Sequence, residues 1–228
     1  MNKKIIIYLV ICFFSVASAN AQAFQKGTKV ISLGIGFAGY GTTQTITTNF
    51  NGVSISNSES DGAASTVIPI QFEYGISNKF GLGAELSFNN YFINDSDKVV
   101  LESVKSVDFG ITGSYHLLNS EKNDLFFTLG LGGSSMSVNY VVTQAQFIES
   151  LSGSGSYFTI GITDRIFFSD NFGVFFNLAY RGYNYTGLEA EFTPAVESAI
   201  ASSNFTYSQS WDWKFTGVHF GTGLAFKF

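Results

Sequence analysis

The feature that most constrains the fold of this chain is a two-residue alternation of side-chain type. Between residues 31 and 38, four large apolar residues alternate with serine, glycine and alanine. Successive side chains of a β-strand point to opposite faces of its sheet, so a period of two indicates strands whose two faces meet different surroundings. We therefore predict an all-β fold.

The same alternation recurs along the chain and predicts eight strands. The segments are 31–38, 67–74, 80–88, 106–117, 125–134, 158–166, 172–181 and 218–228. Asp164 interrupts the apolar face of the sixth segment, and the alternation does not explain it. An even number of antiparallel strands brings both ends of the chain to the same side.

The two faces of these strands differ in a way that favours a membrane. One face carries large apolar side chains, and the other carries glycine, serine, threonine and a few charges. This contrast suits a narrow lumen with lipid outside. The chain holds 25 Phe and 11 Tyr, and 13% of its residues are charged, where about 25% is typical of soluble domains. An open sheet edge would leave backbone groups unsatisfied in hydrocarbon. We predict a closed antiparallel transmembrane β-barrel of eight strands.

Connections between the predicted strands alternate in length. Short polar turns at 77–81, 119–124 and 169–173 alternate with long segments at 41–65, 89–104, 141–155 and 186–210. In such barrels the short turns face the periplasm and the long loops face outside, which places both termini in the periplasm. Capping patterns predict two short helices in the outer loops, one between Thr143 and Gly153 and one from Pro194 to Ala201.

The N-terminus has the pattern of a secretory leader. Two lysines precede an apolar run over 5–16 and small residues that end at Ala21. That run is short of the about 20 residues of a membrane-spanning helix. We predict a signal peptide over 1–21 and a barrel domain over 22–228. The single cysteine, Cys12, lies inside the leader, so the mature chain is expected to form no disulfide. The residues around Cys12 disfavour lipidation.

The C-terminal strand closes on a terminal aromatic residue. Its alternate apolar positions are Phe220, Leu224, Phe226 and Phe228. This pattern resembles the signal by which the barrel-assembly machinery recognises outer-membrane barrels. With the leader and the eight strands, the chain resembles the small barrels of the OmpA and OmpX type, without a peptidoglycan-binding domain. The resemblance implies contact with outer-membrane lipid and lipopolysaccharide; its members include structural proteins, adhesins, partner-binding subunits and a few enzymes.

Several ionisable residues fall on the small-residue face and are expected inside the barrel. They are Glu73, Glu85, Asp108, His116, Arg165, Arg181 and His219. Buried charges must be paired, and the lumen of a barrel this narrow is filled by side chains. We therefore predict an internal network of ion pairs and hydrogen bonds that plugs the lumen. The alternative is a gated ion path or a proton-linked site.

Sequence patterns for catalysis, metal binding and nucleic-acid binding are absent. The two histidines, His116 and His219, stand without a neighbouring nucleophile motif and are too few for a convincing metal site. The net charge is −5 and the lysines and arginines form no cluster, which disfavours nucleic acid as a partner. We predict a protein that is not an enzyme and needs no cofactor.

Three aromatic residues on the lumen face raise a second functional possibility. Tyr183, Trp211 and Trp213 lie near predicted strand ends, where they could line an outer vestibule for a hydrophobic ligand. Our leading interpretation is a structural or interaction role, carried by the extracellular loops or by lateral contact with a membrane partner. The alternatives are a porin-like conduit for small or hydrophobic molecules and a lipid-modifying enzyme.

Overall fold

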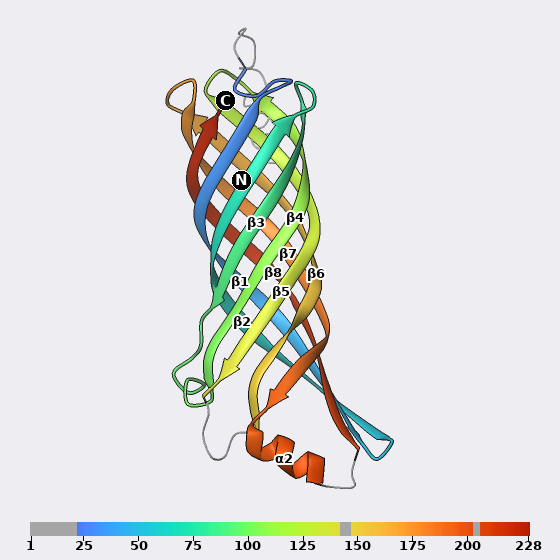
Figure 1. Cartoon of the computed structure of the whole chain (residues 1–228). Helices are drawn as coiled ribbons and strands as arrows, with labels where there is room; N and C mark the ends of the chain where they lie inside the picture. Colours follow the sequence, from blue (N-terminus) through green and yellow to red (C-terminus); the bar gives the residue numbers. More distant parts are fainter. Residues whose placement is uncertain (1–21, 142–146, 203–205) are drawn as a thin grey trace, which may run out of the picture.

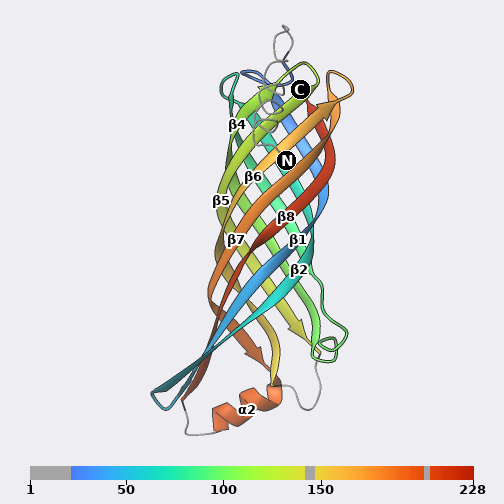
Figure 2. The same cartoon turned by 180° about the vertical axis from the view of Figure 1, so that it is seen from behind.

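The computed structural model describes residues 22–141, 147–202 and 206–228. In these ranges, eight antiparallel strands form a closed barrel in sequence order, with β1 paired to β8 (Figures 1 and 2). The strands are β1 (Lys29–Phe50), β2 (Val53–Gly75), β3 (Phe80–Tyr91), β4 (Leu101–Asn119), β5 (Asn123–Tyr140), β6 (Ile148–Phe167), β7 (Phe172–Phe192) and β8 (Tyr207–Lys227). The predicted fold class is confirmed.

The two ends of the barrel differ. The turns that join β2 to β3, β4 to β5 and β6 to β7 lie at one end, where β1 begins and β8 ends; we call this the turn end. The helix α2 (Pro194–Ser202) and the long hairpin of β1 and β2 lie at the other, the hairpin end (Figure 1). The model has no helix, within the ranges it describes, that is long and apolar enough to cross a membrane.

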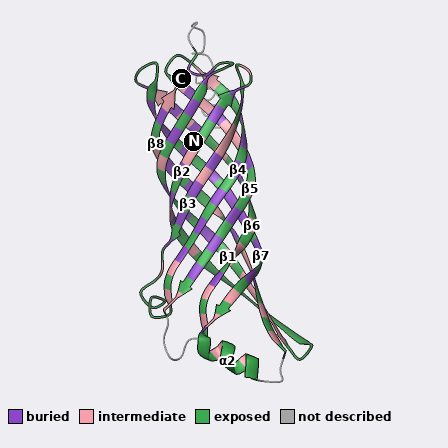
Figure 3. Cartoon of the chain, in the orientation of Figure 1, coloured by how far each residue is buried: buried purple, intermediate pink, exposed green. Residues whose placement is uncertain are grey.

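The outer surface of the barrel carries the large apolar side chains. On β1, Ile31, Leu33, Ile35 and Phe37 are 38% to 57% exposed, whereas Val30, Ser32 and Ala38 on the opposite face are buried. Buried and exposed positions alternate in this way along much of each strand, whereas residues 53–62 of β2 are all exposed (Figure 3). The predicted orientation, with apolar residues outward and small or polar residues inward, is confirmed.

Glycine makes the seam between β1 and β8 narrow enough to close. Gly217 lies opposite Tyr40, and a Cβ added to it would collide with the carbonyl of Gly39 and lie 2.7 Å from the Cα of Tyr40. A side chain at this position would push the two strands apart. A residue without a side chain is therefore a steric requirement at position 217.

The segment 41–65, expected to be a long loop, is mostly strand. β1 and β2 continue to a two-residue turn at Asn51 and Gly52, which have φ of 50° and 84°. Positive φ at both positions matches the type I′ turn, whose twist suits a hairpin. Hydroxyl pairs cross the hairpin on one face: Thr43 with Ser60 (3.4 Å), Thr45 with Ser58 (2.7 Å) and Thr47 with Ser56 (2.9 Å).

Of the two predicted helices, one is confirmed and one is wrong. α2 begins at Pro194, and the carbonyl of Thr193 accepts hydrogen bonds from the backbone N–H groups of Val196 and Glu197. Residues 148–153 are instead part of β6, because Leu151 pairs with Val138 and is buried in the lumen. The start of that predicted helix, Thr143 to Gln146, lies outside the described residues.

Candidate functional site

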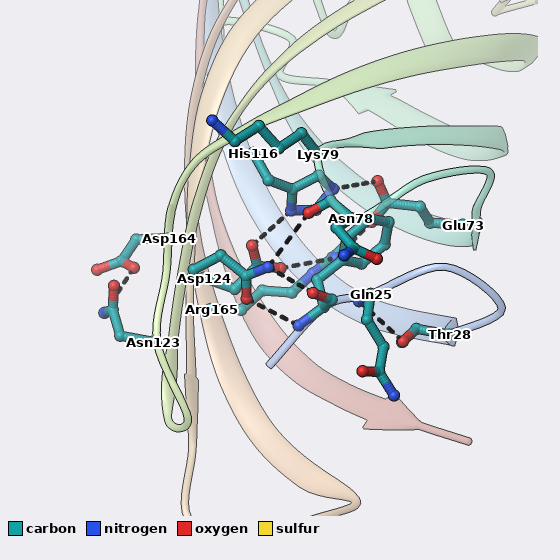
Figure 4. A network of polar contacts seen from close by, with 12 residues as sticks. Gln25, Thr28, Glu73, Asn78, Lys79, His116, Asn123, Asp124, Asp164 and Arg165 are labelled. Atoms are coloured by element: carbon teal, nitrogen blue, oxygen red, sulfur yellow. Dashed lines mark hydrogen bonds and ion pairs between the residues drawn. The ribbon is translucent and has the colours of Figure 1, made fainter. Parts of the chain in front are cut away.

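Four charged residues meet inside the turn end of the barrel, one from each of β2, β4, β5 and β6. We call Glu73, His116, Asp124 and Arg165 the turn-end quartet (Figure 4). Arg165 Nη1 lies 2.5 Å from Glu73 Oε2 and 3.5 Å from Asp124 Oδ2. His116 Nδ1 lies 2.5 Å from Asp124 Oδ1, and its Nε2 lies 3.2 Å from Glu73 Oε1. Two cations and two carboxylates alternate in a ring that is neutral when His116 carries both protons.

The N-terminal segment covers this quartet from the turn end. The buried ring of Phe24 stacks on His116, with centroids 3.5 Å apart and an interplanar angle of 11°. Backbone hydrogen bonds hold the segment in place: Ala23 N–H donates to the carbonyl of Ser120 (2.7 Å), and Phe24 N–H donates to Asn119 Oδ1 (2.9 Å). Residues 22–28 therefore close the barrel where β1 begins.

A second ion pair spans the middle of the lumen. Arg181 Nη2 on β7 lies 2.7 Å from Glu85 Oε1 on β3, and both side chains are at most 2% exposed. Glu85 also accepts hydrogen bonds from Gln71 Nε2 (2.7 Å) and Ser87 Oγ (2.9 Å). A cavity of about 20 Å³ lies beside this pair, which is room for about one water molecule.

The predicted lumen residues Asp108 and His219 are held by neutral partners. Asp108 accepts hydrogen bonds from Ser134 Oγ (2.6 Å), Asn89 Nδ2 (2.8 Å) and the Tyr183 hydroxyl (2.9 Å). His219 donates through Nδ1 to Asn177 Oδ1 (3.1 Å). Each is joined to the barrel wall by donors and acceptors from other strands, so the polar network extends along the lumen.

Aromatic side chains fill the lumen towards the hairpin end. The buried members of this aromatic cluster are Tyr40, Tyr91, Tyr157, Tyr183, Tyr185, Trp211 and Phe215. Tyr183 and Tyr185 are stacked with centroids 6.2 Å apart, and Trp213 meets Phe215 edge-on at 5.7 Å. The residues expected at a vestibule lie in this cluster: Tyr183 is 3% and Trp211 8% exposed, and Trp213 is partly buried against it.

Sequence reasoning placed one member of the turn-end quartet, Asp124, in a turn, and it did not identify the aromatic residues that pack against the quartet. Asp124 was expected in a polar turn, yet its even position on β5 places it on the inward face, as it does Phe126, whose ring lies 4.2 Å from the guanidinium carbon of Arg165. Strand parity could have identified both. Asp164 faces away from the quartet and accepts a hydrogen bond from Asn123 Nδ2 (2.9 Å; Figure 4).

The predicted assembly residues lie on the last part of β8 and directly after it, on the outward face. Phe220, Leu224 and Phe228 are exposed, and the ring of Phe226 lies 5.4 Å from that of Phe172 on β7. This is the placement expected of a signal read from outside the barrel wall. Recognition by the assembly machinery stays a prediction.

A solved structure with the same fold is an outer-membrane protein. OprG from Pseudomonas aeruginosa aligns with a TM-score of 0.63 at 12% identity, over 92% of this chain and 99% of OprG. Ail of Yersinia pestis (14% identity, 89% and 99% coverage) and the protease OmpT of Escherichia coli (10% identity, 94% and 100% coverage) align with TM-scores of 0.43. No family model and no curated protein matches the sequence. The chain has the fold of the small eight-stranded outer-membrane β-barrels.

Proposed function

We propose that this protein is a non-conducting, non-enzymatic barrel of the outer membrane that acts by contact with another protein at its hairpin end. Both termini would then lie in the periplasm, and the apolar belt would contact outer-membrane lipid and lipopolysaccharide. The observation that carries the proposal is the filled lumen, which holds the turn-end quartet, the Glu85–Arg181 pair and the aromatic cluster in succession.

The contents of the lumen support a closed barrel rather than an ion path. A hydrated ion could pass the middle of the barrel only if Arg181 separated from Glu85, and both side chains are almost fully buried. Separating such a pair without replacement partners leaves uncompensated charges at low dielectric, which costs several kcal/mol. Passage from the turn end would also require the segment 22–28 to leave.

The surroundings of the histidines support a structural role for them. His116 is held between Asp124 and Glu73 and covered by the ring of Phe24, and His219 is held by Asn177. Neither ring contacts a serine hydroxyl through any hydrogen bond of the described residues. General-base activation of a nucleophile would need such a contact.

The length of the strands supports a role at the hairpin end. Strands such as β7 and β8 have 21 residues, which at about 3.3 Å per residue and a tilt of about 40° span about 50 Å. The apolar band of a transmembrane barrel is only about 25 Å tall. About half of the length of these strands therefore stands outside the band, as ordered structure that anchoring in the membrane does not require.

Two measurements test the proposal. Purified protein in planar lipid bilayers should give no ion current above the baseline of the bare membrane, and steady conductance steps would overturn the closed-lumen part. Photo-crosslinking side chains at Thr47 and Ser56 on the hairpin, in cells, should give adducts with a discrete protein. The matched control site is Phe109 in the apolar belt, where only lipid adducts are expected; adducts with lipid alone from all three sites would overturn the contact role.

A further inference from the structure

Among the residues that the structure describes, no strand pairs with one edge of β2 over its outer half. β2 pairs with β1 from Val53 onward, but its pairing with β3 begins only at Ser65. Residues 53–62 are all exposed and project from the barrel in the hairpin (Figures 1 and 2). A strand with one neighbour presents unpaired backbone groups on its other side, which is a template for another strand.

The residues that direct their backbone groups to this edge follow from the ladder. In an antiparallel pair, alternate residues bond to a given neighbour. The carbonyl of Ala64 accepts a hydrogen bond from Phe92 N–H on the β3 side, so residues of the same parity face that side. Ser54, Ser56, Ser58 and Ser60 therefore offer N–H and C=O to the free edge, whereas Gly62 N–H is already bonded to Asp61 Oδ1 (2.7 Å).

Most of the usual protections of an exposed edge are absent from this segment, whose only charged residues are Glu59 and Asp61. Natural edge strands carry charged side chains, lysine above all, a proline or a bulge that prevents another strand from adding to them. The sequence of 53–62, VSISNSESDG, contains no lysine and no proline, and its pairing with β1 runs without a register shift. The edge is therefore regular and offers eight backbone groups to a further strand.

The side chains beside the edge define the chemistry of an added strand. Val53 and Ile55 are 64% and 70% exposed, and Glu59 and Asp61 on the same face are exposed and in no ion pair of the described residues. Ser54, Ser56, Ser58 and Ser60 occupy the other face. An added strand with apolar residues opposite the tip and lysine or arginine opposite the acids would match both ends of the edge.

We propose that the free edge of β2 binds an extended, basic segment of a protein partner by strand addition. A second copy of this chain is a poorer occupant, because residues 41–64 contain no lysine or arginine to meet Glu59 and Asp61. Anionic lipopolysaccharide is disfavoured by the same two acids. The inference rests on the proposed contact role and names the surface and the class of partner that would carry it.

A synthetic decapeptide tests the edge directly. The probe is Thr-Lys-Thr-Lys-Thr-Gln-Thr-Val-Thr-Val, which in antiparallel pairing sets its lysines opposite Asp61 and Glu59 and its valines opposite Ile55 and Val53. Binding to the full chain in lipid nanodiscs is measured by fluorescence anisotropy and by hydrogen–deuterium exchange. We expect saturable binding and slower exchange of the amides of Ser54, Ser56, Ser58 and Ser60.

Matched variants distinguish the contribution of the backbone to peptide binding from that of the side chains. Ser58→Pro removes an N–H from the free edge and leaves the ladder to β1 intact, whereas Ser58→Ala loses only the hydroxyl contact with Thr45. Affinity should fall at least tenfold in Ser58→Pro and change less than twofold in Ser58→Ala. The Glu59→Lys/Asp61→Lys variant should also lose at least tenfold. Its control is Glu102→Lys/Glu149→Lys, at two exposed acids of the hairpin end.

The outcomes distinguish this inference from the function on which it rests. Equal affinity in Ser58→Pro and Ser58→Ala, no binding of the peptide, or protection elsewhere on the barrel would overturn strand addition at β2. So would association of two copies without peptide. If Thr47 and Ser56 give protein adducts in cells but the peptide does not bind, the contact role at the hairpin end stands. Only strand addition at the free edge of β2 is then rejected.

Discussion

Replacing Arg165 with methionine should destabilise the barrel more than any substitution at its surface. Arg165 is the cation shared by Glu73 and Asp124, at 2.5 and 3.5 Å, and all three side chains are at most 5% exposed. Its loss changes the turn-end quartet from two cations and two carboxylates to one cation and two carboxylates. Removing one partner from a buried pair typically costs 3–5 kcal/mol, and the contact with the ring of Phe126 adds about 1 kcal/mol. We expect the free energy of unfolding to fall by about 5 kcal/mol.

Urea unfolding in phospholipid vesicles measures this loss. The reporter is the fluorescence of Trp211 and Trp213, the only tryptophans of the chain, which lie in the aromatic cluster away from the substitution. The control is Lys98→Met, which breaks an exposed ion pair with Asp95 (2.7 Å) and should change the free energy of unfolding by about 0.5 kcal/mol or less.

A second variant tests whether charge balance is the cause. Adding Glu73→Gln to Arg165→Met leaves His116 and Asp124 as one cation and one carboxylate, so the double variant should recover at least half of the lost stability. Non-additivity of this kind is expected of residues in one network. A loss below about 1 kcal/mol in the single variant, or a double variant less stable than the single one, would refute the reasoning.

Two further substitutions and one deletion have defined outcomes. Phe24→Ala removes a buried ring from His116 and should lower the free energy of unfolding by about 3 kcal/mol in the same urea assay. Gly217→Val should prevent the heat-dependent gel shift of a closed barrel, whereas Gly39→Val, whose Cβ would meet nothing within 4 Å, should retain it. Deletion of Phe228 should reduce the amount inserted in cells while refolding of the purified chain into detergent micelles proceeds normally; equal cellular levels would contradict an assembly signal at this residue.

The membrane-facing part of the fold is predictable because lipid imposes a contrast on every strand. Outward Ile, Leu and Phe alternate with inward glycine, serine and threonine, and strand parity alone placed Glu73, Glu85, Arg165 and Arg181 on one face. Which glutamate meets which arginine depends on strand stagger and tilt around the barrel. Arg165 lies on β6 and Glu73 on β2, and nothing local to either residue specifies that contact.

The hairpin end was harder to predict because both of its faces meet water. Between residues 41 and 62 threonine, serine and other small or polar residues outnumber the large apolar residues Ile46, Phe50, Val53 and Ile55, so the apolar contrast is weakened although the strands continue. The pair Asn51–Gly52 was the available signal, since Asn-Gly is the preferred sequence of a type I′ turn. The cover formed by Phe24 had no local signal, because it depends on the lumen that other strands build.

The hydroxyl ladder of the β1–β2 hairpin has a thermodynamic consequence for recognition. A mobile surface loop of similar length must give up conformational entropy when a partner orders it, at about 0.5–1.5 kcal/mol for each immobilised side chain. This hairpin is already ordered when the protein has folded. Its backbone is paired from Phe50–Val53 down to the barrel wall, and three threonine–serine contacts cross it. A binding partner would therefore spend little of its interaction energy on ordering the receptor, and a short segment with few contacts could bind with useful affinity.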